Sequence, residues 1–186
     1  MIYETFDCQK HDVYKVASLV YDVDFRTFDM LFKNKNDAVD TIAKDLAKGK
    51  TDDMFKVILD DNREILGMLI IYTSSTSHKF YLKSIKLLIV DILDHFVLCD
   101  IEDGDFYVAE IAISPDLRGQ GLGYEVLSQV IDYAKSKNYK RVILDADFRN
   151  AGAKNLYEKL GFKVFNKKRL KLGSFERGMY NMEFNL

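Results

Sequence analysis

The 186-residue chain lacks the features that mark several large classes of protein. Its two cysteines, Cys8 and Cys99, lie far apart without Cys-x-x-Cys spacing, so we expect reduced thiols rather than a disulfide framework. No apolar stretch approaches the roughly 20 residues that span a bilayer. The N-terminus lacks the basic start and apolar core of a signal peptide. These absences predict a soluble, cytoplasmic protein with no membrane partner.

An excess of charge of one sign is also missing. The formal net charge is −2, whereas a surface that binds nucleic acid is usually basic, so no nucleic-acid partner is expected. The chain has one proline and no Pro/Gly/Ser-rich linker, internal repeat or low-complexity tract. With 48% hydrophobic and 30% charged residues, it is expected to form a single domain, 1–186, with a substantial core.

The hydrophobic periodicity predicts a mixed α/β fold. Helices are expected at 11–21, at 25–32, from Asn36 or Asp37 to Gly49, at 122–136 and from Asn150 to Gly161. Strands are expected at 1–7, 54–59, 65–72, 106–113, 142–144, 162–165 and 179–184, with 54–59 and 65–72 forming a hairpin. For 79–98 a mostly buried helix is the first choice, and an additional strand is the alternative.

The stretch Leu117–Gly123, L-R-G-Q-G-L-G, is the most informative in the chain. It joins the apolar run Val108–Ile113 to a helical pattern, and its three glycines leave backbone amides bare at a helix start beside Arg118. Such a site suits a phosphate-bearing ligand. A Walker loop would need Lys-Ser/Thr after the last glycine, and a dinucleotide loop would need G-x-G-x-x-G. The chain has neither, and a plain tight turn is the alternative.

Two motifs together resemble the GNAT superfamily of acyl-CoA-dependent N-acetyltransferases. Arg118–Gly123 matches the signature Arg/Gln-x-x-Gly-x-Gly/Ala, and Asn150–Phe162 is similar to the second signature, Asn-x-x-Ala-x-x-Leu-Tyr-x-x-x-Gly-Phe. The resemblance covers about 104–165 and implies an α/β (α+β) fold with a mostly antiparallel central sheet flanked by helices. Residues 1–103 carry no matched motif. In that family the N-terminal helices and flanking loops generally select the acceptor, which here implies roughly 21–35, 74–103 and 166–178.

The resemblance also implies acetyl-CoA as co-substrate and an amine as acceptor. Tyr157 is then the acid that protonates the coenzyme A sulfur, and a strand amide is the oxyanion donor. Tyr157 could instead be a packing residue, Asn150 a plain helix cap and Arg118 a solvated flank. The residues expected to bind the cofactor are Ile111, Ala112, Ile113, Arg118, Gly119, Gln120, Gly121, Leu122, Gly123, Asn150 and Tyr157.

The base that deprotonates the amine has more than one candidate. Glu110 stands inside an otherwise apolar strand, an expensive position for a carboxylate without a partner or a function. Asp145 follows the next apolar strand, where some family members carry an acidic base, and Asp147 shares its face by strand alternation. Either carboxylate could simply face solvent. A water molecule acting with neither is the third option.

Two further groups of residues are not expected to take part. The three histidines show no metal-ligand spacing, so surface positions and no metal are predicted for His11, His78 and His95. The basic cluster could attract a phosphate or an acidic partner, but a solvated loop between two strands is preferred for Lys163, Lys167, Lys168, Arg169 and Lys171.

The sequence therefore predicts an N-acetyltransferase that transfers the acetyl group of acetyl-CoA to a primary amine by direct attack. A non-catalytic acyl-CoA sensor or scaffold is the alternative, although the presence of Tyr157 counts against it. A nucleotide-binding protein is the second rival. The acceptor could be a small molecule, a protein N-terminus or a lysine. The apolar residues of 79–98 would suit a homodimer interface, a lid or plain core.

Overall fold

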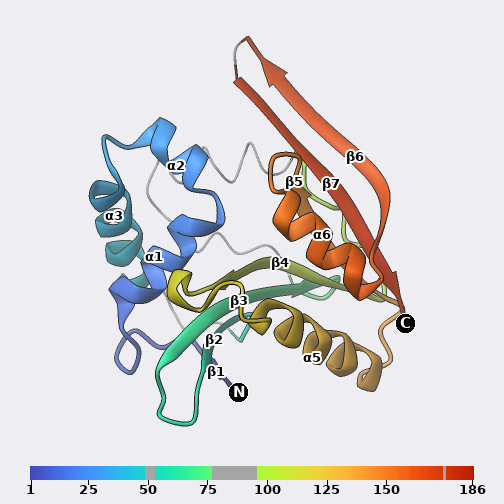
Figure 1. Ribbon diagram of the computed structural model, residues 1–186, viewed down its shortest axis with the longest axis horizontal. Helices are drawn as coiled ribbons and strands as arrows, with labels where there is room; N and C mark the ends of the chain where they lie inside the picture. The colour runs from blue at the N-terminus through green and yellow to red at the C-terminus, as the bar shows by residue number, and fades with distance from the viewer. Residues whose placement is uncertain (49–52, 77–95, 174) are drawn as a thin grey trace. The chain divides into compact units, whose positions relative to one another are not determined.

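The structure, a computed structural model, describes residues 1–48, 53–76, 96–173 and 175–186 (Figure 1). These residues form two compact units, each described here by itself. The N-terminal unit comprises 1–48, 53–70 and 110–118, and the C-terminal unit comprises 71–76, 96–109, 119–173 and 175–186. The prediction that 1–186 is one domain stays a prediction.

Hydrogen-bonded pairing gives the strand order β1-β2-β3-β4-β5-β7-β6. Strand β4, Asp105–Ile113, runs from the C-terminal unit into the N-terminal unit. β1 pairs with β2, β2 with β3, β5 with β7 and β6 with β7, all antiparallel, whereas β4 and β5 are parallel. The predicted fold class, a mixed and mostly antiparallel sheet with helices, is therefore confirmed.

The N-terminal unit contains the predicted hairpin. Strands β1 (Ile2–Thr5), β2 (Phe55–Leu59) and β3 (Ile65–Thr73) lie side by side. Asp60 closes the hairpin turn, because its Oδ1 accepts the amides of Asn62 and Glu64 at 2.9 and 2.8 Å. At Gly67 in β3 a Cβ would collide with the Ala112 carbonyl oxygen, so only glycine allows this close approach of β3 to β4.

Three helices cover 13–48 of the N-terminal unit: α1 (Val13–Val23), α2 (Phe25–Leu31) and α3 (Lys35–Lys48). α1 packs on α3 through buried aliphatic side chains such as Val16, Val20 and Ile42. These helices confirm the three that the hydrophobic periodicity of the sequence predicts in this region. The expected cap of α3, Asn36 or Asp37, is wrong.

The residue that caps α3 is Asn34, whose Oδ1 accepts the Asp37 amide at 2.9 Å. An N-cap side chain reaches an amide two or three residues ahead, so Asn36 and Asp37 lie too late, inside the first turn. Asparagine and aspartate both suit a cap, and only the backbone conformation decides which of the three residues serves. The predicted end at Gly49 lies outside the described residues.

The C-terminal unit contains α5 (Leu122–Ser136), β5 (Arg141–Asp147), α6 (Ala151–Leu160), β6 (Lys163–Leu172) and β7 (Phe175–Asn185). α5 buries Val126, Leu127 and Val130, as its apolar stripe predicts. Both motif-bearing helices are therefore where the sequence expects them. The strands after the second motif are longer than predicted.

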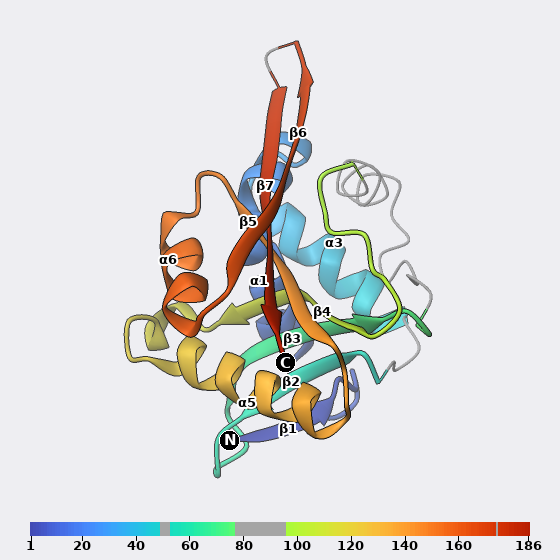
Figure 2. The same ribbon diagram turned by 90° about the vertical axis from the view of Figure 1, so that its right-hand side faces the viewer.

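The basic segment is part of β6 and not a loop, so that prediction is wrong. β6 pairs with β7 from Lys163↔Glu183 to Leu172↔Phe175, and Figures 1 and 2 show the two strands as one long hairpin. β6 ends the strand order, and edge strands commonly carry lysine. Lys168 Nζ donates to Leu98 O and pairs with Asp100, both at 2.8 Å. Pairing with β7, and not the polarity of its own side chains, makes this segment a strand.

The surface position expected for His11 is also wrong. His11 is 8% exposed, and its Nδ1 accepts the Asp7 amide at 3.0 Å. Its Nε2 lies 3.5 Å from Glu4 Oε2, and its ring stacks on Phe6 with centroids 6.1 Å apart. A turn over 7–11 folds the ring inward, which composition does not reveal. His78, His95 and the predicted helix of 79–98, apart from 96–98, lie outside the described residues.

Candidate active site

The glycine loop has the backbone conformation that its glycines make accessible. It follows the short 3-10 helix η1 (Pro115–Leu117). Gly119 and Gly121 have φ values of 77° and 85°, in the left-handed region that favours glycine. A Cβ at either position would meet no atom within 4 Å. The backbone is thus approachable from the side where these side chains would stand.

The loop leads into α5, whose first α-helical bond runs from the Glu125 amide to the Gly121 carbonyl at 3.1 Å. The amides of Leu122, Gly123 and Tyr124 precede this bond, so they have no carbonyl partner within the helix. Gln120 is exposed, and Leu122 and Gly123 are half-buried. Amides of this kind, at the start of a helix and without partners within it, are able to bind a phosphate group.

Arg118 is held at both ends of its guanidinium group. Nε donates to the Ile113 carbonyl at 3.1 Å, and Nη2 pairs with Asp22 Oδ2 at 2.9 Å. The Asp22 side chain is only 11% exposed, and its other oxygen lies 3.1 Å from Lys35 Nζ. Arg118 is therefore an exposed residue of the N-terminal unit whose guanidinium is anchored by two contacts, and a cofactor contact by Arg118 stays a prediction.

Tyr157 is the one buried residue of α6, at 6% exposure. Its ring packs against Phe162, with centroids 6.1 Å apart. Its hydroxyl makes no hydrogen bond with any residue that the structure describes. Burial raises the pKa of Tyr157 to about 12, and the charge of Asp145 adds to this. The phenol is consequently protonated at every physiological pH.

Asp145, in β5, accepts four hydrogen bonds. Its Oδ2 accepts from the Cys99 amide at 3.0 Å and from the Tyr107 hydroxyl at 2.7 Å. Its Oδ1 accepts from the Cys99 thiol at 3.2 Å and from Asn181 Nδ2 at 2.5 Å. A carboxylate has about four acceptor positions, so these donors use its whole capacity. The residue is half-buried, but its carboxylate is enclosed.

The enclosure changes the acidity of Asp145 and of its neighbour Cys99. Burial raises the pKa of Asp145, against the lowering effect of the bonds from Cys99, Tyr107 and Asn181. Burial, followed by the charge of Asp145, also raises the pKa of the Cys99 thiol. Cys99 is therefore a protonated hydrogen-bond donor and not a nucleophile.

The remaining predicted residues lie in both units. Glu110 is half-buried in β4, and its Oε2 atom is shielded from solvent. Ala112 is buried, whereas Ile111 and Ile113 are half-buried. These four belong to the N-terminal unit, whereas Asp145, Tyr157 and the glycines 119–123 belong to the C-terminal unit.

Two other predicted residues already have local tasks. Asn150 is exposed and caps α6, because its Oδ1 accepts the Ala153 amide at 3.0 Å. Asp147 shares the face of Asp145, as alternation predicts, and pairs with Arg149 at 2.6 Å. Cap and ion pair account for both side chains, and a cofactor contact by Asn150 stays a prediction.

Sequence reasoning missed the donors that surround Asp145: Cys99, Tyr107 and Asn181. Asn181 is fully buried in β7 and also donates to Val97 O at 3.1 Å. An asparagine between the core residues Met179 and Met182 was a usable signal, since a buried amide needs partners. Tyr107 stands in an apolar run, where its hydroxyl gives little warning. Cys99 carries no signal in the sequence.

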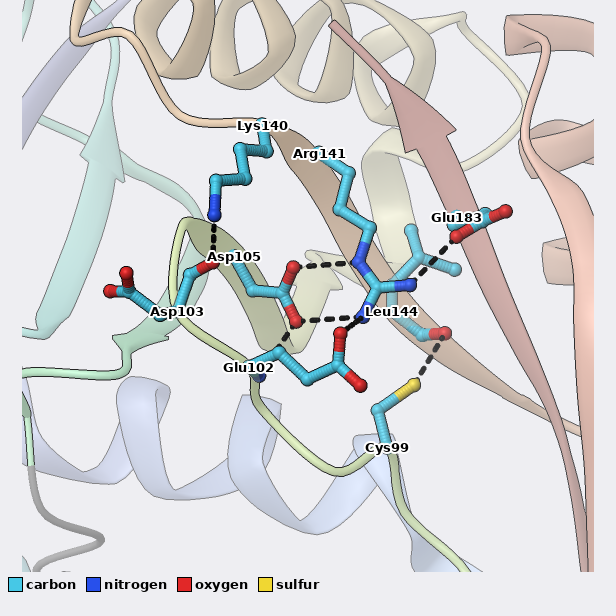
Figure 3. A network of polar contacts seen from close by, with 8 residues as sticks. All are labelled: Cys99, Glu102, Asp103, Asp105, Lys140, Arg141, Leu144 and Glu183. Carbon is cyan, nitrogen blue, oxygen red and sulfur yellow. Dashed lines mark hydrogen bonds and ion pairs between the residues drawn. The ribbon is translucent and has the colours of Figure 1, made fainter.

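A second polar network lies at the other end of β5 (Figure 3). Arg141 Nε and Nη2 bind the two oxygens of Asp105 at 2.6 and 3.0 Å. Nη1 binds Glu183 and Nη2 also binds Glu102, at 2.8 and 3.0 Å. These bonds raise the pKa of the Arg141 guanidinium above its ordinary value, against the lowering effect of burial. The network joins β5 to β7 and to the turn before β4.

Within 1–48, 53–76, 96–173 and 175–186, no group of three His, Cys, Asp or Glu side chains is arranged to hold a metal ion. No helix in those same ranges combines the length and the apolar character needed to cross a membrane.

The candidate site consists of a glycine loop, a buried protonated tyrosine and an enclosed carboxylate.

Comparison with known proteins identifies the family. The sequence model of the acetyltransferase (GNAT) family matches residues 20–162, and the chain belongs to this family. An uncharacterized N-acetyltransferase of Methanocaldococcus jannaschii is 38% identical over 55 residues. This match covers 30% of the chain and 24% of that relative, so the chain spans only about a quarter of its length.

Solved structures of acetyltransferases are similar in fold to this chain. A crystal structure of an N-acetyltransferase from Staphylococcus aureus Mu50 has a TM-score of 0.68 at 20% identity, covering 99% of this chain and 100% of that one. A Bacillus subtilis acetyltransferase solved in complex with CoA has a TM-score of 0.57 at 12% identity, covering 99% and 97%. At these identities the likeness concerns the fold alone.

Proposed function

We propose that the chain is an N-acetyltransferase that transfers the acetyl group of acetyl-CoA to a primary amine by direct attack. The observation that carries this proposal is the buried Tyr157 phenol, whose pKa of about 12 keeps it protonated. It lies in the same unit as the glycine loop, on the helix of the second family motif. A protonated phenol can donate a hydrogen bond to a departing thiolate.

The first turn of α5 is proposed to bind the pyrophosphate of acetyl-CoA. Its amides are oriented donors, and no side chain at Gly119 or Gly121 would hold a phosphate away. A backbone amide of Ile111–Ile113 is proposed as the donor to the developing oxyanion. Asn150 is proposed to contact the cofactor arm in addition to capping α6.

We propose Glu110 as the group that accepts the proton of the attacking amine, directly or through a water molecule. Its rival Asp145 already accepts four hydrogen bonds, which favours a supporting role: it orients Tyr107, and its charge adds to the effect of burial in raising the pKa of Tyr157. Glu110 is half-buried, and its place in β4 suits a base beside the oxyanion donor.

The reaction then balances in one transfer. The amine nitrogen forms the new N–C bond, the C–S bond breaks, and the amine proton passes to the base. Tyr157, with a pKa of about 12, is a weaker acid than a thiol with a pKa of about 8.5. Its expected contribution is therefore a hydrogen bond to the thiolate rather than complete proton transfer.

The test is a panel of small amines, peptides with free N-termini and lysine peptides, each mixed with acetyl-CoA and assayed for free thiol. Release above background hydrolysis with any acceptor supports transfer and excludes a non-catalytic sensor. Tyr157→Phe is expected to lower kcat by about 10- to 1000-fold. Tyr133→Phe, at an exposed tyrosine of the same unit, is the control. An unchanged kcat in Tyr157→Phe would remove Tyr157 from the chemistry.

Cofactor binding is tested separately by thermal shift. Saturating acetyl-CoA should raise Tm by several degrees, whereas stabilisation by ATP or NAD instead would overturn the proposal. Gly121→Val should weaken acetyl-CoA binding. Gly173→Val is a matched control, because Gly173 also has a positive φ, of 61°, and no atom within 4 Å of a Cβ. Equal affinity for acetyl-CoA in Gly121→Val and Gly173→Val would contradict the proposal that the glycine loop binds the pyrophosphate.

A further inference from the structure

The side chain of Asp22, near the end of α1, touches the residue that starts the glycine loop. Asp22 Oδ2 pairs with Arg118 Nη2 at 2.9 Å, across 96 positions in sequence. The Asp22 side chain is 11% exposed, whereas that of Arg118 is 52% exposed. The carboxylate is thus a largely buried and fixed group, and the arginine is the partner that it orients.

Arg118 carries that orientation to the backbone. Its Nε donates to the Ile113 carbonyl at 3.1 Å, and its own amide donates to the Pro115 carbonyl at 3.2 Å. An arginine can make the Asp22 and Ile113 contacts at once because its guanidinium is a planar fork with several donors. A lysine has one nitrogen and cannot span both.

The loop beyond Arg118 depends on such an anchor. Gly119 and Gly121 have positive φ values, and glycine has more backbone freedom than any other residue. A Cβ at either glycine would meet no atom within 4 Å, so close packing does not confine the loop there. The direction in which the loop starts is consequently set by Arg118, and its far end by α5.

We propose that Asp22 is a positioning residue for acetyl-CoA binding, acting through Arg118. The pair holds the start of the loop so that the amides at the N-terminus of α5 are ready for the pyrophosphate. This rests on the proposed function. α1 overlaps 21–35, one of the segments expected to select the acceptor. The contact between Asp22 and Arg118 therefore also links that segment to the affinity for acetyl-CoA. Asp22 makes no contact with the cofactor in this account.

A competing account predicts an effect of opposite sign. If Arg118 left Asp22 to bind the phosphate, Asp22 would compete with the cofactor, and its removal would tighten binding. The sign of the change therefore separates positioning from competition. The neighbouring bond from the Tyr21 hydroxyl to Asp29 Oδ1, at 2.6 Å, supplies a control for general weakening of the first two helices.

The experiment measures the Kd of acetyl-CoA by calorimetry for the wild type, Asp22→Asn, Asp22→Glu, Asp29→Asn and Arg118→Lys. Asp22→Asn and Arg118→Lys should each raise Kd about 5-fold, a modest coupling between sites. Asp22→Glu should recover most of the affinity because it keeps the carboxylate. Asp29→Asn should leave Kd unchanged, whatever its effect on stability. With an acceptor in hand, Asp22→Asn should raise KM for acetyl-CoA more than it lowers kcat.

The double variant Asp22→Asn with Arg118→Lys should bind acetyl-CoA no more weakly than the weaker-binding single variant, because both changes break the same contact. A wild-type protein that does not bind acetyl-CoA would overturn the proposed function. Binding by the wild type with an equal or lower Kd in Asp22→Asn would overturn this inference alone. If Asp22→Asn does not fold, Arg118→Lys against Asp22→Glu decides the same question.

Discussion

Two carboxylates of the C-terminal unit, Asp105 and Asp145, are enclosed in different ways. Asp105 is 2% exposed and binds the Arg141 guanidinium through both oxygens. Asp145 accepts hydrogen bonds from three side chains, Tyr107, Asn181 and Cys99, and from the Cys99 backbone amide, all formally neutral. Asp105 is paired with a cation, whereas burial raises the pKa of Asp145 and its neutral donors do not offset that effect. The second arrangement is typical of a functional site.

The largest expected effect is the loss of Arg141. Arg141→Met leaves the buried carboxylate of Asp105 without its cation, so the free energy of unfolding should fall by about 3–5 kcal/mol. Urea denaturation measures this. Arg141→Met combined with Asp105→Leu should recover much of the loss, since an apolar pair replaces the ion pair. A double variant no more stable than the single one would mean that Asp105 is not the cause.

Matched Asp→Asn substitutions test the comparison directly. Asp105→Asn should lower the free energy of unfolding by about 2 kcal/mol, because a charged hydrogen-bonded pair is lost, and leave kcat unchanged. Asp145→Asn should cost about 1 kcal/mol or less at pH 7, because the amide removes a buried charge while it loses acceptors. It should also lower kcat by about 10-fold. Equal losses of stability would erase the distinction.

The pH dependence of stability sharpens the same point. A carboxyl with a raised pKa binds its proton more tightly in the folded state, so its contribution to stability falls as pH rises above 3.8, its ordinary value. The free energy of unfolding of wild type minus that of Asp145→Asn should therefore decrease from about pH 4 upward, by at most about 1.4 kcal/mol per pH unit. Chemical denaturation at several pH values measures it. A rising difference would contradict the raised pKa.

The smallest effect concerns the thiol beside Asp145. Cys99 is buried with a raised pKa, whereas Cys8 is half-buried, so Cys99 should react with a thiol reagent far more slowly in the native protein. Cys8→Ser isolates the slow reaction for measurement. Adding Asp145→Asn removes the nearby negative charge, and the reaction should accelerate. Equal rates with and without Asp145 would mean that burial alone protects Cys99.

The sequence was most successful where structure is local. The apolar stripe of α5, the Asn150 cap of α6 and the hairpin turn at Asp60 all depend on residues within a few positions of one another. The two family motifs lie on such elements, which is why the helices that carry them were predicted well. Their roles in binding and catalysis stay proposals.

The errors concern residues whose environment comes from elsewhere in the chain. The basic segment forms β6 because β7 pairs with it, and His11 is buried because a turn folds it onto Phe6. Asp145 could be named as an acidic residue after a strand. Its donors Cys99, Tyr107 and Asn181 come from three other segments, so no local pattern could reveal that its oxygens are already engaged.

The sequence by itself determined the family motifs and most helices and strands, because such features depend on short-range sterics and hydrogen bonds. The tertiary structure alone decided which polar groups meet. It joined Asp22 to Arg118 across 96 positions and enclosed Asp145 among neutral donors. Long-range packing sets these partners, and partners determine charge state and orientation.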